Sequence, residues 1–598
     1  MSLPNYQEVI AHPDVLSIFA TYLDVNSLVA VSRVTRAWHN FANPLLWADP
    51  ITIISQLTTP FLKLVSFMRK LKDIEIGRAS KTRDLVITLN FKPLVALQYQ
   101  LAYQQQYAQA EGFITTQWIF KNAAYMQNLR FIMVDGLSVL QDIPPFQRDD
   151  GSPHPAQVLL LSTSWMPDIN SNWIAVDEAF RNLMFLDISY TTRTEDFTRV
   201  YSTCSFPNLR VLKLRGLRLT DTHLPRAIAN GHKLWSLDVR DNLLTDQAVE
   251  MLLQRFILPP IAQPTHAVTS TDMDLFDNPP VYQREPRVET ALHMVPLRPD
   301  DEDGFMEYVS RNGNLAQEDH PPLDDADDML RPTGLTQLYI SGNKLTSLGV
   351  HRLLHQTTRL QVLDVGSVRA PTMQLNIAYA THLAQLNSVH ALKSQSGTRL
   401  EVLRIHHSVV TCAPTILPSN SSNYDLRHLH KAEIEFSNRQ VGALEALHPL
   451  DNPRIRYLCL TDIPTKSYGP ILNRLKEFIT LCASQQRLIE IAATGIGAAH
   501  HRGPKLLTGL RTLRLEFIQD NGSAVGISAS GDRDADEFLA QSMGDFSFFE
   551  GGLDAPPQPP PPLTEALKVV EDLREFRRTM VQKWNGKLEL VVPRSPAV

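Results

Sequence analysis

Histidine pairs are the residues of this chain whose chemistry needs to be considered first. They occur at His406-His407, at His428 with His430, and at His500-His501. Neutral imidazole binds metal ions and serves as a general base near neutral pH. No cysteine or acid stands at metal-ligand spacing around these pairs, and histidines are common on protein surfaces. We therefore expect no metal site and no cofactor.

Other catalytic motifs are incomplete. The pair Gly495-Ile-Gly497 has neither the third glycine nor the downstream acid of a dinucleotide site. The run from Gly526 to Ser530 lacks the final glycine of a nucleophile elbow, and no phosphate-binding lysine loop occurs. The sequence thus predicts a protein that is not an enzyme. A deep polar pocket that joins the histidines would instead favour the alternative hypothesis that the protein is an enzyme.

Residues 12–51 have the spacing of three short amphipathic helices. Pro13 suits a first helical position, the break Asp24-Val-Asn26 holds a residue able to cap the second helix, and Trp38 continues the apolar periodicity with Phe41. About forty residues without a cysteine is too few for a closed core. We expect another part of the chain, or a partner, to cover the remaining apolar face.

This segment resembles the F-box, the adaptor-binding module of SCF-type ubiquitin ligases. It departs from the family pattern at His12, Ser27 and Thr35. The resemblance implies docking onto a Skp-family adaptor and, through it, a cullin. The alternative is a helical cap that only seals the end of a larger domain. The residues that would bind the adaptor are Pro13, Leu16, Ile18, Phe19, Leu23, Leu28, Val31, Val34, Trp38, Leu46 and Trp47.

The rest of the chain repeats a leucine phrase. Residues 234–249 and 335–350 both match the leucine-rich-repeat pattern, with an asparagine at Asn242 and Asn343, and an amphipathic helix follows each. Weaker copies, 25 or 26 residues apart where nothing intervenes, begin at Leu129, Leu183, Leu209, Leu360, Leu400, Ile455 and Leu510. The predicted fold class is α/β: a three-helix F-box followed by a right-handed leucine-rich-repeat solenoid, a horseshoe with irregular insertions.

Residues that flank the repeated leucines should project from the inner, concave face of that sheet. Arginine and tyrosine are frequent there, and both are enriched at binding hot spots. We expect a protein substrate to bind this face, although any leucine-rich repeat must solvate it. The predicted contact residues are Lys213, Arg215, Asp238, Arg240, Tyr339, Arg404, His406, Arg514 and Glu516, with Gln337, Asp364 and Tyr457 beside them.

Two segments interrupt the repeats. Residues 259–332 hold eleven prolines and sixteen acids, and we interpret them as a solvated, mostly disordered insertion. The alternative is that they shield the concave face or mimic its ligand. Residues 519–562 are rich in Gly, Asp and Pro and are expected to form a spacer. The expected domains are residues 1–55 (helical module), 56–258 and 333–518 (repeats), the two insertions, and 563–598 (a helix, stopped by Gly586, and a last strand).

Composition bounds the function. The start of the sequence has no signal-peptide pattern, no run of about twenty apolar residues occurs, and Cys204, Cys412, Cys459 and Cys482 show no pairing spacing. We expect a cytoplasmic or nuclear protein with no membrane contact. The net charge of −6 disfavours nucleic acid. The leading hypothesis is a substrate receptor that acts by proximity, and the alternative is a non-degradative scaffold.

Overall fold

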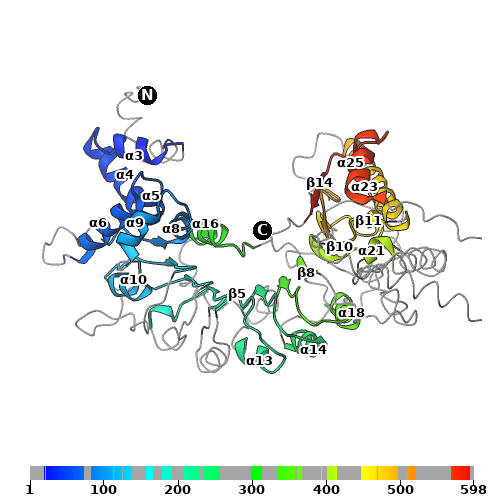
Figure 1. Ribbon diagram of the computed structural model, residues 1–598, viewed down its shortest axis with the longest axis horizontal. Coiled ribbons are helices and arrows are strands. Elements are labelled where there is room, and N and C mark those ends of the chain that lie inside the picture. The colour runs from blue at the N-terminus through cyan, green and yellow to red at the C-terminus, as the bar shows by residue number, and fades with distance from the viewer. Residues whose placement is uncertain are drawn as a thin grey trace, which may run out of the picture. The chain divides into compact units, whose positions relative to one another are not determined.

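The computed structural model places the chain in two compact units (Figure 1). Unit 1 comprises residues 1–268, 285–369 and 397–400, and unit 2 holds the remaining residues up to 598. The structure describes residues 19, 22–72, 83–111, 114–123, 125–137, 157–165, 178–191, 206, 208–228, 233–255, 298–312, 335–356, 360–366, 392, 400–413, 446–467, 469–495, 508–518 and 567–592.

Unit 1 begins with short helices whose ends carry capping side chains. The Asp24 carboxylate accepts from Ser27 N at 2.9 Å, and the Thr35 hydroxyl accepts from Trp38 N at 3.2 Å. Asp24, in the predicted break at residues 24–26, is therefore the N-cap of the second predicted helix. The helices of this region are α3 (Val25–Val31), α4 (Arg36–Ala48), α5 (Pro50–Ser55), α6 (Pro60–Lys72), α8 (Lys92–Gln98), α9 (Gln104–Ala110) and α10 (Thr116–Ala123).

Eight parallel strands follow in unit 1, and each pairs with the next in chain order. The predicted strand positions are confirmed, and β1 and β3 are additional. The parallel α/β character of the predicted fold class is thereby established. The strands are β1 (Thr88–Asn90), β2 (Phe131–Met133), β3 (Leu160–Ser162), β4 (Phe185–Asp187), β5 (Val211–Lys213), β6 (Ser236–Asp238), β7 (Gln337–Tyr339) and β8 (Val362–Gly366).

The strand register sorts side chains onto two faces of the sheet. The central residue of each three-residue strand pairs with its equivalent in the next strand and is buried, as for Leu186, Leu212 and Leu237. Alternation along a strand sends the flanking residues to the opposite side. We call this opposite side the inner face. Its two rows are Phe131, Leu160, Phe185, Val211, Ser236 and Gln337, and Met133, Ser162, Asp187, Lys213, Asp238 and Tyr339.

Asparagine side chains join successive strand units. Asn343 donates to the carbonyls of Val239 and Ile340 at 2.9 and 2.8 Å, and its oxygen accepts from Leu244 N at 3.0 Å. Asn242 makes the equivalent bonds one unit earlier. Both asparagines are buried, so each satisfies backbone groups that water cannot reach.

Helices and single turns complete the units around these strands. They are η2 (Glu178–Phe180), α13 (Leu224–Ala227), α14 (Asp246–Arg255), α16 (Glu302–Asn312) and α18 (Ser347–Gln356). Helices α14 and α18, from successive repeats, pack against each other. Strands β6 and β7 remain in register although about 100 residues separate them along the chain. The segment between α14 and β7 is therefore an insertion that leaves the strand pairing unchanged.

Helix α16 lies within residues 259–332, and for most of that segment the expected disorder stays a prediction. Residues 298–312 of this acidic segment are described, and they contain an eleven-residue helix. Phe305 is completely buried and Val309 nearly so. Figure 1 shows α16 (green) beside α8 (blue), and Lys92 at the start of α8 forms an ion pair with Glu302 at 3.0 Å. The rest of this segment, and all of residues 519–562, lie outside the described residues.

Unit 2 holds four more parallel strands, paired in the order β9, β10, β12, β14. A two-stranded antiparallel pair, β11 with β13, lies beside helix α23. Helices α23 and α25 contact each other (Figure 1). The elements are β9 (Val402–His406), α21 (Ser408–Thr411), η6 (Pro449–Asp451), β10 (Tyr457–Ile463), β11 (Lys466–Ser467), α23 (Pro470–Gly495), β12 (Thr512–Phe517), β13 (Leu567–Lys568), α25 (Val569–Thr579) and β14 (Lys587–Val591).

The C-terminal helix is shorter than the sequence predicts. It ends at Thr579, so Gly586 does not stop it. Trp584 lies after the helix, is almost fully buried, and donates from its indole nitrogen to the carbonyl of Leu510 at 3.3 Å. Any Cβ at Gly586 would collide with the Trp584 ring. Gly586 is therefore required for close packing against the tryptophan, and the last predicted strand is confirmed as β14.

Candidate protein-binding surfaces

The N-terminal helices expose apolar side chains. Helix α3 has no buried residue. Phe19 is 53% exposed and Val34 is 68% exposed, and Tyr22 and Leu45 are also exposed. Within α4, Trp38 packs edge-on against Phe41 with ring centroids 6.4 Å apart. Among the described residues of this segment, the apolar faces of α3 and of the start of α4 are therefore only partly covered.

Burial increases along these helices toward the rest of unit 1. The Trp47 ring at the end of α4 stacks on Phe67 of α6 at 5.9 Å, and Ile51 in α5 is fully buried. Of the predicted adaptor-binding residues, Leu23, Leu28, Val31, Trp38, Leu46 and Trp47 are half-buried, whereas Pro13, Leu16 and Ile18 lie outside the described residues. The helices are thus anchored at one end and exposed at the other.

One row of the inner face of unit 1 is apolar from β2 to β5, and α16 packs against it. Phe305 packs against Phe185 and Trp235 with ring centroids 5.3 and 6.4 Å apart. Tyr308 meets the Trp235 ring edge-on at 5.7 Å. The buried cluster beneath the helix consists of Phe131, Met133, Leu159, Leu160, Met184, Phe185, Val211 and Trp235. Residues 298–312 of the acidic segment thus cover this part of the face. That the segment as a whole shields the face or mimics its ligand stays a prediction.

Charge complements this contact at the start of α16. Glu302 forms ion pairs with Lys92 at 3.0 Å and with Lys213 at 3.8 Å. Burial alone would raise the pKa of Glu302, but the two ammonium groups bring it below its usual value. Arg298 lies over the Trp235 ring at 4.8 Å. Lys213, predicted as a substrate contact, is therefore already engaged by the chain itself.

Three predicted contact residues on the same face, Arg215, Asp238 and Arg240, are engaged in an ion-pair network around the buried Asp238 carboxylate. The carboxylate of Asp238 binds Arg215 Nε at 2.5 Å and Arg240 Nη2 at 2.7 Å. Arg240 also reaches Asp364 at 3.5 Å and lies over the Tyr339 ring. Asp238 is 2% exposed, so the prediction that its side chain is presented to a partner is wrong. Its role is to orient the two arginines.

The inner face of unit 2 carries a second charged network, which reaches from β9 across β10 to β12 and β14. Arg404 of β9 pairs with Glu516 of β12 at 2.8 Å, and Arg514 binds the same carboxylate at 2.9 Å. Arg514 also approaches Glu589 of β14 at 3.7 Å. These side chains are about a fifth to a third exposed, so the predicted residues Arg404, Arg514 and Glu516 form one accessible polar patch.

His406 and His407 are core residues. Their rings stack at 4.6 Å, and both are buried. Burial lowers the pKa of His406 to about 4 and holds that of His407 well below its usual value. His406 therefore does not project as a substrate contact, which corrects its prediction. No group of three or more potential metal ligands occurs among the described residues, and His428, His430, His500 and His501 lie outside them.

An exposed aromatic pair was missed by the sequence reasoning. The Trp165 ring stacks on Tyr190 with centroids 4.1 Å apart, and Trp165 is 62% exposed. Both residues have positive φ, of 60° and 59°, in the turns that follow β3 and β4. The Tyr190 hydroxyl donates to Asp241 at 2.8 Å. Positive φ also occurs in the turns after the neighbouring strands, at Gly136, Gly216, Asp241 and Gly342. These turns therefore share one backbone conformation, although their sequences differ and do not reveal it.

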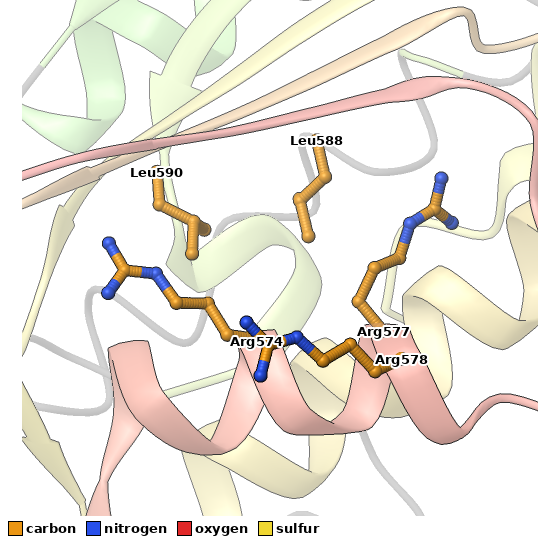
Figure 2. A pocket seen from close by; sticks show the side chains of 5 residues that line it. All are labelled: Arg574, Arg577, Arg578, Leu588 and Leu590. Carbon is orange, nitrogen blue, oxygen red and sulfur yellow. The ribbon is translucent and has the colours of Figure 1, made fainter.

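A pocket of about 400 Å³ lies between α25 and β14 in unit 2. Figure 2 shows Arg574, Arg577 and Arg578 on the helix facing Leu588 and Leu590 on the strand. Arg577 donates to the Gly586 carbonyl at 2.8 Å. No acid is among the described lining residues. The arrangement suits an anionic group beside an apolar one and provides no nucleophile.

No model of a known protein family matches this sequence, and no curated protein matches it. A membrane-crossing helix would need more length and apolarity than any helix in the described part of the chain offers. Cys412, Cys459 and Cys482 are free thiols. The surfaces described above are therefore interpreted from their own geometry.

Proposed function

We propose that this chain is a substrate receptor of an SCF-type ubiquitin ligase. In this proposal residues 1–55 form an F-box that binds a Skp-family adaptor and, through it, a cullin. The parallel strands belong to a leucine-rich-repeat solenoid whose inner face binds a protein substrate. A charged ubiquitin-conjugating enzyme supplies the chemistry, so the receptor contributes proximity alone.

The observation that carries the proposal is the gradient of burial along the N-terminal helices. An end cap would bury its apolar side chains against the domain that it seals. Here α3 buries none, whereas α5 is anchored in unit 1. Apolar helices held at one end and uncovered at the other are typical of a docking site for another protein.

The repeat interpretation has separate support. Buried asparagines bond backbone groups of successive units, and the left-handed turns recur in step with the strands. Stacked units with a parallel sheet and one helix per complete repeat fit a leucine-rich repeat. Such proteins commonly act by binding along an extended face.

Capture of a purified Skp-family adaptor tests the proposal. The full chain should bind the adaptor, and the double variant Phe19→Asp with Val34→Asp should bind at least tenfold more weakly, because it places carboxylates in the apolar contact. Ser66→Asp, which adds a single carboxylate at an exposed position of α6, is the control and should bind as wild type. Unaltered binding by the double variant would contradict the proposed docking surface.

A non-degradative scaffold is the second candidate, because the engaged inner faces are built for binding whether or not a bound protein is degraded. Deleting the gene separates the two. The partner of a receptor should accumulate, whereas the partner of a scaffold should keep its abundance and lose its location.

A further inference from the structure

We propose that α16 is an internal occupant of a protein-binding surface on unit 1. The inner face over β2 to β6 is a site for an amphipathic helix with an acidic first turn, and α16 fills it until a partner helix takes its place. This inference rests on the proposed function, because it names the class of substrate that the receptor would select.

Helix α16 comes from an insertion between two neighbouring strands. Strands β6 and β7 pair in register without the segment that contains α16, and α14 already supplies the helix of that repeat. The segment is therefore not required to complete the sheet. It nevertheless places an eleven-residue helix over the inner face, the side expected to bind partners.

The contact between α16 and the sheet has the spaced anchor residues by which proteins bind an amphipathic helix. Glu302, Phe305 and Val309 stand at positions i, i+3 and i+7, which lie on one side of a helix. The carboxylate meets Lys92 and Lys213, and the two apolar side chains enter the cluster around Trp235. The opposite side of α16 is solvated, since Asp303, Glu307 and Ser310 are exposed.

The composition of the sheet surface beneath α16 also favours a binding site. Solvated sheet faces are polar, but here Phe131, Leu160, Phe185 and Val211 form an apolar row, and Trp235 belongs to the same buried cluster. A row of this kind requires an apolar partner. Lysines beside it add selectivity for a helix with acidic residues in its first turn, since opposite charges across an interface determine which partner fits. The structure thus points to partners that present Glu-x-x-Phe-x-x-x-Val or a close equivalent on a helix.

Peptide binding to the full chain tests exchange directly. The probe is a fluorescent peptide with the sequence of residues 298–312, followed by anisotropy. The variant Phe305→Asp with Val309→Asp should release α16, because carboxylates cannot remain in the apolar cluster. We expect it to bind the peptide at least tenfold more tightly than wild type. Ser310→Asp adds a charge on the solvated side and should behave as wild type.

Two further measurements complete the test. A peptide carrying Glu302→Lys should bind the released variant at least tenfold more weakly, because it opposes Lys92 and Lys213. In the wild-type protein, hydrogen exchange of α16 amides should be at least tenfold faster than that of β4 to β6 amides. This second readout does not depend on the variant folding.

The inference is overturned if a variant that melts like wild type gains no affinity for the peptide. It is equally overturned if α16 amides exchange only at the rate of the strands, because the helix would then be a fixed part of the core. Adaptor capture is independent of both readouts. Loss of adaptor binding with retained peptide exchange would refute the ligase proposal and leave this binding surface intact.

Discussion

Replacing Asn343 by alanine should destabilise unit 1 through three hydrogen bonds at once. The side chain is 4% exposed and bonds Leu244 N, Val239 O and Ile340 O at 3.0, 2.9 and 2.8 Å. Alanine leaves the buried N–H without an acceptor and removes one bond from each carbonyl. Because a buried unsatisfied group costs about 1–3 kcal/mol, the sum is roughly 3–5 kcal/mol.

The assay is thermal unfolding of the full chain with hydrogen exchange at the Leu244 amide. A loss of roughly 3–5 kcal/mol in a unit of this size lowers Tm by about 10 °C, since each kcal/mol corresponds to about 2–4 °C. The Leu244 amide should lose protection, because its acceptor is the Asn343 side chain. Lys344→Ala, at the exposed neighbouring position, is the control and should melt like wild type.

Asn343→Asp separates the acceptor role of this side chain from its donor role. Aspartate keeps an acceptor for Leu244 N but replaces the donor with an oxygen that faces two carbonyls. It should be at least as destabilising as alanine near neutral pH. If Asn343→Ala melted within about 1 °C of Lys344→Ala, and Leu244 stayed protected, the asparagine bridge would not be what joins these repeats.

Two other perturbations have defined outcomes. The pKa of His406 is about 4 in the folded protein and about 6.5 in the unfolded chain, so the unfolded state binds more protons between these pH values. Stability should therefore fall as pH drops through this window, by about 3 kcal/mol from His406, and His407, whose pKa is also lowered, adds to the fall. His406→Asn should reduce that dependence in urea unfolding without abolishing it, and an unchanged slope would argue against the burial of His406 as a neutral ring. Gly216→Ala combines a positive φ of 63° with a collision against Tyr190, and should cost about 1–3 kcal/mol by the same measurement. A neutral result would show that the Tyr190 ring moves freely.

Leucine spacing predicted most of the strands because burial on one side of a parallel sheet constrains those positions strongly. The spacing is fixed by stacking, so Leu186, Leu212 and Leu237 occur at nearly constant intervals and pair in register. β3 was missed because Leu159, Leu160 and Leu161 run without alternation. The run arises because both sides of β3 are buried. One of these sides is buried by α16, and no local sequence pattern reveals that contact.

Candidate residues for binding were harder to predict. Sequence position shows which face a side chain occupies, and this held for Arg404, Arg514 and Glu516, which meet across three strands. It does not show whether that face is already covered. The acidity of residues 298–312 favoured disorder, yet two apolar residues on one helical side outweigh it when an aromatic surface lies opposite.

The last strand has a consequence for solubility. Among the residues that the structure describes, β14 pairs on one side only, with β12. An unpaired strand edge can pair with the same strand of other molecules and so build fibrous aggregates. A charged lysine at the edge is a common safeguard against this. Lys587 begins β14 with its side chain 72% exposed. It would repel the same residue of a second molecule, and neutralising it should make concentrated solutions more prone to precipitate.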